Sequence, residues 1–371
     1  MGRRLEGLAD HFGGSGTSAL AAQFLGIKPT TIEVNPFLAD LIEAKIAPYN
    51  LERAGWWFGR VVDAAAQAPA TPIAFPGAPG TFVEPGVDGR FIFSTEVAQR
   101  LVAYRDAIDA VGDLVIRRLF KVILASVAIP VSNVVVSGKG RRYRRSGGGR
   151  RGDPRVVDRL FADGVLAAFF DLRRYESRRC RDYVVLRGDA RIVTRSIEEI
   201  DLAVFSPPYP NSFDYTDVYN VELWVLGYLT DSASNRALRE ATLRSHVQIK
   251  RDMSAEASNS STLNQSVENL HRVRSRLWNP YIPEMVAAYA DDMRSVLRAL
   301  RARLRPGGRV YMAVGDSRYA GVDVPVAKIL VEEAPALGFE VVRAEPFRSM
   351  RASPQQGGRA ELPETLIVLA A

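Results

Sequence analysis

A glycine-rich turn near the start of the chain limits most strongly what the sequence can fold into. Residues 7–20 read Gly-Leu-Ala-Asp-His-Phe-Gly-Gly-Ser-Gly-Thr-Ser-Ala-Leu, which predicts a short apolar strand, a turn and the start of a helix. Glycine allows positive φ and a close approach of the backbone to a ligand, and the N–H groups that begin a helix bind polar or anionic groups. A second apolar run ends in Glu33, roughly 20 residues later, the spacing at which nucleoside-binding α/β folds bring a carboxylate to a ribose diol. The segment therefore predicts a strand–helix–strand unit with a ligand at the carboxyl ends of its strands.

A second motif lies in the middle of the chain, directly after another apolar run. Residues 201–205 predict a strand, and Ser206-Pro207-Pro208-Tyr209 follow it. Proline fixes φ and has a carbonyl oxygen but no N–H. A hydroxyl, a carbonyl and an aromatic ring are thus expected together at the sheet edge where open α/β folds bind ligands. This set suits an exocyclic amino group on a planar base, because it offers two acceptors for the N–H groups and one ring for stacking.

Taken together, these segments resemble the motifs of DNA methyltransferases. Residues 10–17 are similar to the family motif Asp-Pro-Phe-x-Gly-Ser-Gly-Thr, with His11 in place of proline, and residues 32–36 to its Ile-Glu-x-Asn-Pro segment. The Ser-Pro-Pro-Tyr motif resembles the catalytic motif of amino-directed enzymes, in the form associated with cytosine N4. Residues 184–191 look like the strand whose terminal aspartate faces the adenine of S-adenosylmethionine. The glycine turn and the acid alone fit a dinucleotide dehydrogenase equally well, and the order of the motifs favours the methyltransferase.

The resemblance implies S-adenosylmethionine as cofactor, double-stranded DNA as partner, and a role for each matched residue. The residues expected at the cofactor are Asp10, Phe12, Gly13, Gly14, Ser15, Gly16, Thr17, Glu33, Asn35, Asp189 and Ala190. The residues expected at the methyl acceptor are Ser206, Pro207, Pro208 and Tyr209, with Phe213 and Tyr215 open between base pocket and core packing. Ser206 and the Pro207 carbonyl would accept hydrogen bonds from the amino group of a flipped base, on which Tyr209 stacks. Adenine N6 is the alternative acceptor, although adenine enzymes usually have Asp at the position of Ser206.

The arrangement of the motifs predicts an α/β fold that is doubly wound around a mostly parallel, seven-stranded methyltransferase sheet. Residues 1–48 would form the first part of this core, with the cofactor motif, and residues 182–371 the remainder, with the catalytic motif. Residues 49–181 exceed an ordinary crossover connection, so we expect a large, mainly helical insertion between strands 2 and 3 that could bind DNA or recognise the target. The polar stretch 231–280 predicts a loop or a second small insertion. The resemblance implies an antiparallel hairpin of the last two strands at one edge.

Within the insertion, residues 138–151 form a basic stretch that predicts a flexible cationic arm. It contains Arg141, Arg142, Arg144 and Arg145 among several glycines. A charge run is usually a solvated face, but in a protein expected to bind DNA these arginines are candidates for phosphate contacts, which position a duplex without reading its sequence. The formal net charge of +7 likewise favours a polyanionic partner.

The resemblance also implies a segment that lines the methionine end of the cofactor pocket and precedes the glycine motif. The chain begins only a few residues before this motif. We therefore expect a truncated start, a partner chain or homodimer that completes the pocket, or an insertion that substitutes for the segment. A cofactor- or DNA-binding subunit with little activity alone is the alternative from another functional class.

Composition argues against several other classes. A single cysteine excludes an intramolecular disulfide and a cysteine-rich zinc site, and three scattered histidines have no metal-ligand spacing, so no metal is expected. The apolar run 111–131 is interrupted by charged residues, and no signal peptide is visible at the N-terminus. These features predict a cytoplasmic protein without a membrane segment.

Overall fold

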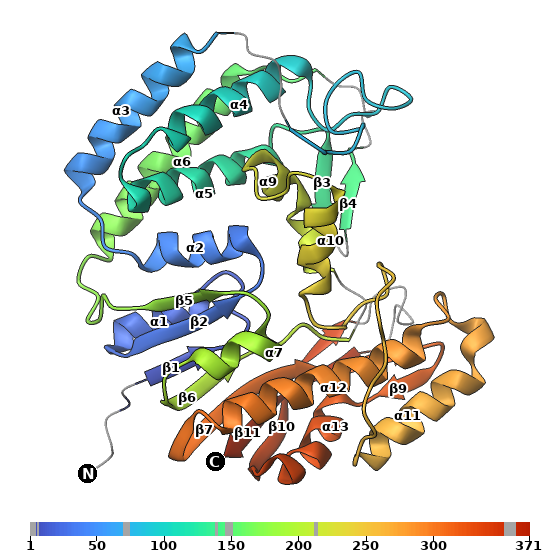
Figure 1. Cartoon of the computed structure of the whole chain (residues 1–371). Coiled ribbons are helices and arrows are strands. Elements are labelled where there is room, and N and C mark those ends of the chain that lie inside the picture. Colours follow the sequence, from blue (N-terminus) through green and yellow to red (C-terminus); the bar gives the residue numbers. More distant parts are fainter. Residues whose placement is uncertain are drawn as a thin grey trace. The chain divides into compact units, whose positions relative to one another are not determined.

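The computed structural model of the chain describes residues 5, 7–69, 75–137, 140–144, 151–210, 214–351 and 361–371. The chain forms two compact units, which are described separately (Figure 1). The first, here called the sheet unit, consists of Met1–Val34, Asp182–Asp214 and Arg239–Ala371. The second, the helical unit, consists of Asn35–Arg181 and Tyr215–Leu238.

A seven-stranded sheet is the centre of the sheet unit in the described part of the chain. From one edge to the other its strands are β10 (Glu340–Arg351), β11 (Glu361–Ala370), β7 (Leu304–Gly315), β6 (Ile200–Phe205), β1 (Gly7–Asp10), β2 (Lys28–Glu33) and β5 (Val184–Arg187). The five strands from β7 to β5 are parallel to one another, whereas β11 is antiparallel to both of its neighbours. The predicted α/β fold, with its mostly parallel sheet and its edge hairpin of the last two strands, is confirmed.

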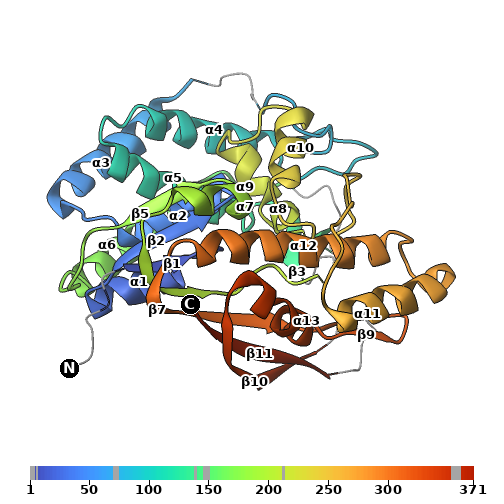
Figure 2. The ribbon, with the colours of Figure 1, turned by 60° about the horizontal axis from the view of Figure 1, so that its bottom comes forward.

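Besides three short 3-10 helices at Thr194–Ser196, Arg274–Arg276 and Pro335–Leu337, the described sheet unit contains five complete α-helices and one small hairpin. They are α1 (Thr17–Leu25), α7 (Ala190–Val193), α11 (Ser261–Arg272), α12 (Ile282–Arg301), α13 (Val326–Glu333), and the strands β8 (Ser317–Tyr319) and β9 (Val322–Val324). Figure 2 shows α12 and α13 on one face of β7, β11 and β10. Tyr289, Met293, Leu297 and Leu300 recur at helical spacing along α12 and are buried in the core of this unit.

The stretch 231–280, which the sequence predicts to be a loop or small insertion, contains ordered helices. Ser260 caps α11 by accepting a hydrogen bond from the Leu263 N–H at 3.0 Å. Leu263 and Leu270 are seven residues apart, so they lie on the same face of the helix, and both are buried. The apolar face of this helix packs on the core of the unit, although the surrounding composition is polar.

The helical unit contains the predicted insertion between strands β2 and β5, together with a short later segment. Its elements are α2 (Pro36–Ile46), α3 (Leu51–Gln67), α4 (Thr95–Asp109), α5 (Leu114–Ala128), α6 (Arg155–Arg174), α8 (Tyr215–Val218), α9 (Asn220–Val225), and the hairpin of β3 (Val134–Ser137) and β4 (Gly140–Tyr143). The helix α10 (Ser232–Glu240) begins in this unit and ends in the other. The rings of Tyr104, Phe120 and Phe161 are buried against one another in its core.

Two structural features of the helical unit bear on the sequence predictions. The helix α3 begins at Asn50, whose side chain accepts from the Arg53 N–H at 2.9 Å, and it was not predicted from the sequence pattern. Trp224 on α9 is buried in the core of this unit. None of the helices in the described ranges is long and apolar enough to cross a membrane.

Candidate functional site

The glycine turn and Glu33 meet at the carboxyl ends of β1 and β2. The backbone N–H of Gly14 donates a hydrogen bond to Glu33 Oε2 at 2.8 Å, and the Gly13 N–H donates to the Ile32 carbonyl at 3.0 Å. Gly14 and Gly16 have φ values of 50° and 82°, which side chains with a Cβ rarely adopt. Gly16 is the N-cap of α1, so the turn delivers the chain into the helix. The structure thus brings together the acid and the glycines that the sequence singled out.

Asp10 ends β1 directly before this turn and is buried. Its Oδ1 accepts from the Phe12 N–H at 3.0 Å, which shapes the entry into the glycine turn. Burial raises the pKa of Asp10 to about 6, although hydrogen bonds from Phe12 and Ser18 act in the opposite direction. A carboxyl group that titrates near neutral pH at the end of a central strand is typical of a ligand site.

His11 occupies the position where the family motif has proline. Its ring is 1% exposed and lies 5.3 Å from the ring of Phe205, measured between centroids. Neither ring nitrogen has a hydrogen-bond partner among the described residues. Burial lowers the pKa of His11 to about 4, so the imidazole is neutral at physiological pH. It fills space as a neutral ring, much as the proline of the motif would.

Asp189 follows β5, the strand next to β2, and its carboxylate already has a partner. It caps α7 by accepting from the Arg191 N–H at 2.9 Å, and it binds the Arg191 guanidinium through both oxygens. The Gly188 N–H before it donates to the Glu33 carbonyl at 3.1 Å, which ties this turn to the end of β2. Ala190, the next predicted cofactor residue, is the buried first residue of α7.

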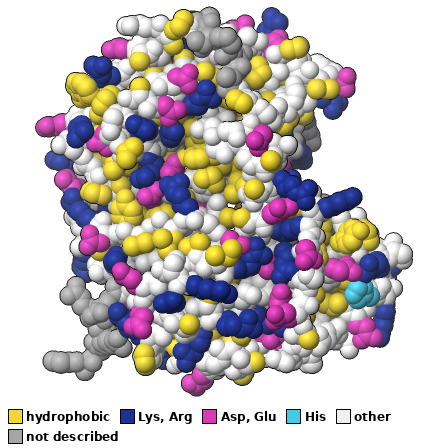
Figure 3. Space-filling model, in the orientation of Figure 1, with side chains coloured by type: hydrophobic (Ala, Val, Ile, Leu, Met, Phe, Trp, Pro, Cys, Tyr) yellow, Lys and Arg dark blue, Asp and Glu magenta, His cyan; other side chains and the backbone are white. Residues whose placement is uncertain are grey.

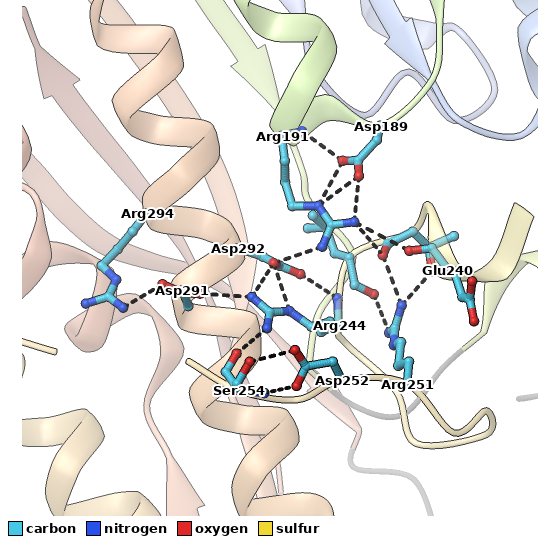
Figure 4. A network of polar contacts seen from close by, with 12 residues as sticks. Asp189, Arg191, Glu240, Arg244, Arg251, Asp252, Ser254, Asp291, Asp292 and Arg294 are labelled. Carbon is cyan, nitrogen blue, oxygen red and sulfur yellow. Dashed lines mark hydrogen bonds and ion pairs between the residues drawn. The ribbon is translucent and has the colours of Figure 1, made fainter. Parts of the chain in front are cut away.

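A network of charged residues connects the Asp189 turn to α12, and sequence reasoning did not identify it (Figure 4). Arg191 Nη1 donates to Asp292 Oδ1 at 2.9 Å, and Arg244 Nη2 donates to the same oxygen at 2.7 Å. Asp292 is buried, and Arg244 also binds Asp291, which in turn pairs with Arg294. Asp292 lies 101 residues from Arg191 in sequence, so no local pattern could have revealed the pair.

The Ser-Pro-Pro-Tyr loop leaves the carboxyl end of β6, the neighbour of β1 on the other side. Ser206 is exposed and Pro207 is buried. The hydroxyl groups of Ser206 and Tyr209 are 3.0 Å apart, and Tyr209 donates to Glu364 Oε1 at 2.5 Å. The carbonyl of the next residue, Pro210, accepts from the hydroxyl of Tyr319 at 2.6 Å. The loop is therefore fixed by side chains from β8 and β11.

Two other predicted site residues, Asn35 and Tyr215, belong to the helical unit and are described within it. Asn35 belongs to the helical unit and caps α2 by accepting from the Phe37 and Leu38 N–H groups. Tyr215 is the first residue of α8 and is 44% exposed, which speaks against core packing. Phe213 and Arg145 lie outside the described residues.

Residues 140–143 of the basic stretch form a strand, so the prediction of a flexible arm is wrong for these residues. These residues form β4, which pairs with the β-branched run of β3 from Val134↔Tyr143 to Ser137↔Gly140. Arg142 is exposed on this hairpin, and Arg141 is half-buried. Arg144 donates from Nε to the Ser132 carbonyl at 3.1 Å and from Nη2 to the Ile129 carbonyl at 3.3 Å, so its guanidinium holds the end of α5.

Neither the charges on the face drawn in Figure 3 nor the metal-ligand residues of the described ranges gather at a second site. On the face drawn in Figure 3, Lys and Arg side chains are interspersed with Asp and Glu, so the net positive charge is not gathered in one patch there. Within the described ranges, no cluster of three His, Cys, Asp or Glu side chains could hold a metal ion.

The strand order, the reversed strand β11 and the motifs at the carboxyl edge of the sheet are consistent with the methyltransferase class of α/β fold. The chain is similar to two curated type II methyltransferases. It is 25% identical to M.AvaI of Nostoc sp. and of Anabaena variabilis over 387 residues, which cover 91% of this chain and 74% of the relative. It is 22% identical to M.BsoBI of Geobacillus stearothermophilus over 402 residues, which cover 95% of this chain and 77% of the relative.

Other comparisons are less informative. No family model matches the chain. A solved structure of the rRNA methyltransferase aviRa from Streptomyces viridochromogenes aligns with a TM-score of 0.30 and 10% identity, covering 100% of this chain and 78% of that one. This similarity is too low to inform function.

Proposed function

We infer that the chain is a DNA methyltransferase that moves a methyl group from S-adenosylmethionine to an exocyclic amino group of a flipped base, the N4 of cytosine. The observation that carries this proposal is the order of four adjacent parallel strands, β6, β1, β2 and β5. Their carboxyl ends share one edge of the sheet, and each presents one matched motif there. The similarity to type II methyltransferases supports methylation of DNA, and the choice of cytosine N4 rests on Ser206 alone.

The residues at this edge fit the cofactor. The Glu33 carboxylate is 7% exposed and accepts a backbone N–H, and it would equally accept the hydroxyl groups of a ribose. The glycine turn allows a ligand to approach the backbone at the start of α1. Asp189 would face the adenine, and Asp10 would lie toward the amino end of the methionine moiety. When bound, S-adenosylmethionine supplies a methyl group on a sulfonium, and the protein supplies orientation.

The methyl acceptor would lie at the Ser206 loop. The amino nitrogen of cytosine is conjugated with its ring and is a poor nucleophile. Hydrogen bonds from its N–H groups to Ser206 Oγ and the Pro207 carbonyl would favour tetrahedral geometry at the nitrogen as charge develops there. Bound S-adenosylmethionine would supply the methyl group to the nitrogen lone pair, and one amino proton would then pass to solvent water. This chemistry needs no strong base, in keeping with the low pKa of the nearby His11.

Nucleoside mass spectrometry tests this proposal directly. DNA from cells that express the chain should contain N4-methylcytosine, and DNA from cells that express Ser206→Ala should not. N6-methyladenine in its place would contradict the assignment from Ser206 but not the reaction class. If the purified chain transfers no methyl group to DNA, the alternative of a subunit that needs a partner chain is favoured.

A further inference from the structure

A chain of hydrogen bonds runs from the exposed Ser206 to a buried carboxylate on a different strand. Ser206 Oγ lies 3.0 Å from the Tyr209 hydroxyl, and this hydroxyl lies 2.5 Å from Oε1 of Glu364 on β11. Glu364 is 3% exposed, and its other oxygen, Oε2, accepts from Nε of Arg348 on β10. No sequence motif points to Glu364, which is 155 residues away from Tyr209.

The packing around Tyr209 holds this chain in place. Glu364 on β11 pairs with Gly315, the last residue of β7. The ring of Tyr209 packs against this same end of β7. A Cβ on Gly315 would lie 2.8 Å from atoms of the Tyr209 ring and 2.2 Å from Met350 Cε. The absence of a side chain at residue 315 therefore gives the ring the space in which its hydroxyl reaches Glu364.

The chemistry of the groups fixes the direction of each hydrogen bond. Arginine only donates, so Arg348 donates to Glu364 Oε2, and the Tyr209 hydroxyl donates to Oε1, so both oxygens of Glu364 act as acceptors. Tyr209 must then donate its single hydroxyl proton to Glu364. Its oxygen keeps only lone pairs for Ser206, so Ser206 donates its proton to Tyr209. The lone pairs of Ser206 Oγ remain available as acceptors, and Ser206 is exposed.

We propose that Glu364, acting through Tyr209, is a positioning residue that holds Ser206 as a hydrogen-bond acceptor and so selects a base with an exocyclic amino group over one with an oxo group. A lone serine hydroxyl rotates and can donate to an oxo group as easily as it accepts from an amino group. Within this series of hydrogen bonds, Ser206 cannot donate to the base without breaking its hydrogen bond to Tyr209. This inference rests on the proposed function, because it concerns the same acceptor site.

The test compares two duplexes that differ only at the target base. Once methylated sites have been mapped in DNA from expressing cells, the affinity of the purified chain is measured for a duplex with cytosine and for one with uracil at the target. If the product is N6-methyladenine, adenine and hypoxanthine take their places. The quantity compared is the ratio of the two affinities, amino base over oxo base, for each variant. A mispaired base is easier to flip, but this difference is the same for every variant and therefore cancels between their ratios.

The variants are Tyr209→Phe, Glu364→Met and, as a matched control, Glu361→Met, which changes an exposed residue of the same strand. Tyr209→Phe and Glu364→Met should each lower the preference for the amino base by about three- to tenfold, the worth of one hydrogen bond. Glu361→Met should keep the ratio of the wild type. In the double variant the preference for the amino base should fall no further than in the more affected single variant, because both residues act through the same series of hydrogen bonds.

Several outcomes decide the matter. An unchanged ratio in both Tyr209→Phe and Glu364→Met, with wild-type methylation intact, overturns this inference and leaves the proposed function standing. A wild-type chain that neither binds S-adenosylmethionine nor methylates DNA overturns both. Calorimetric binding of S-adenosylmethionine by each variant shows that it is folded, since neither side chain belongs to the proposed cofactor residues. If one variant is unfolded, the ratio of the other decides.

Discussion

At the scale of single residues, the candidate site is a set of hydrogen-bond acceptors held by backbone and buried charge. Glu33 accepts from the Gly14 N–H, Asp189 from Arg191, and Glu364 from Tyr209 and Arg348. The sequence revealed Glu33, Asp189 and Ser206 because each stands within a short motif. It could not reveal Glu364 or Asp292, because their roles depend on partners from strands or helices more than a hundred residues away.

The proposed cofactor role of the glycine turn leads to the first prediction. Glu33→Ala removes the carboxylate that is proposed to accept from the ribose, a loss that costs about 1.5–3 kcal/mol, and should weaken S-adenosylmethionine binding by roughly ten- to a hundredfold. Gly14→Val places a β-branched residue at a φ of 50° and should weaken binding as well. Glu268→Ala, on the exposed face of α11, is the control. Unchanged calorimetric affinity in both site variants would refute the assignment.

The raised pKa of Asp10 leads to a prediction about stability. Its pKa is about 6 in the folded protein against an ordinary value of 3.8, so the folded state retains the proton over a range where the unfolded state has lost it. The free energy of unfolding therefore falls as pH rises from about 4 to 6, by about 3 kcal/mol from this group, and stays lower above pH 6. Below pH 4 the contribution of Asp10 is fully present.

The measurement compares urea unfolding of the wild type and of Asp10→Asn between pH 4 and 7. The variant stays neutral, so its stability relative to the wild type should increase as pH rises through this window. The difference between the two proteins is the useful quantity, because buried His11 and His246, whose pKa values are lowered to about 4, change the stability of both in the opposite sense. A difference that is constant with pH would show that Asp10 does not titrate as described.

At the scale of elements, the hairpin β3–β4 combines two kinds of arginine, and they should respond differently to mutation. Arg142→Ala removes an exposed cation, so DNA binding should weaken at all sequences, and the logarithmic salt slope should become shallower by about 0.9 if one phosphate contact is lost. Arg144→Ala removes donors to two backbone carbonyls at the end of α5 and should lower the free energy of unfolding by about 1–3 kcal/mol. Fluorescence anisotropy across a salt series and urea unfolding measure the two effects. An unchanged salt slope for Arg142→Ala would assign this side chain to a solvated face.

The elements that the sequence predicted well are those with a strong local signal. The strands β1, β2, β5 and β6 are short apolar runs next to motifs, and α1 begins directly after the glycine turn, as predicted, because Gly16 is its N-cap. The helix α11 and the strand β4 were missed because their stability comes from a few buried residues and from pairing with β3, respectively. Polar composition predicted loops there, whereas tertiary packing decided the outcome.

At the scale of the whole molecule, the two units share one chain in an alternating order. Three segments of the sheet unit alternate with two of the helical unit, so the chain passes between the units four times. Glu33, Asp189 and Tyr209 each lie fewer than ten residues from such a passage, at Val34, Asp182 and Asp214 respectively. The proposed site is thus built mainly on segments where the chain enters or leaves the sheet unit.

This connectivity leads to a prediction for hydrogen exchange. The intact chain is used, because no single cut separates the two units. S-adenosylmethionine should slow amide exchange in the glycine turn, at the end of β2 and at the turn before α7, since a ligand that binds only the folded state adds about 2.7 kcal/mol to its stability at a hundred times its dissociation constant. Duplex DNA should instead slow exchange in β3 and β4. Glu33→Ala should abolish the first pattern and keep the second, whereas Arg142→Ala should weaken the second alone. Cofactor-dependent protection that is confined to the helical unit would contradict the placement of the cofactor at the carboxyl edge of the sheet.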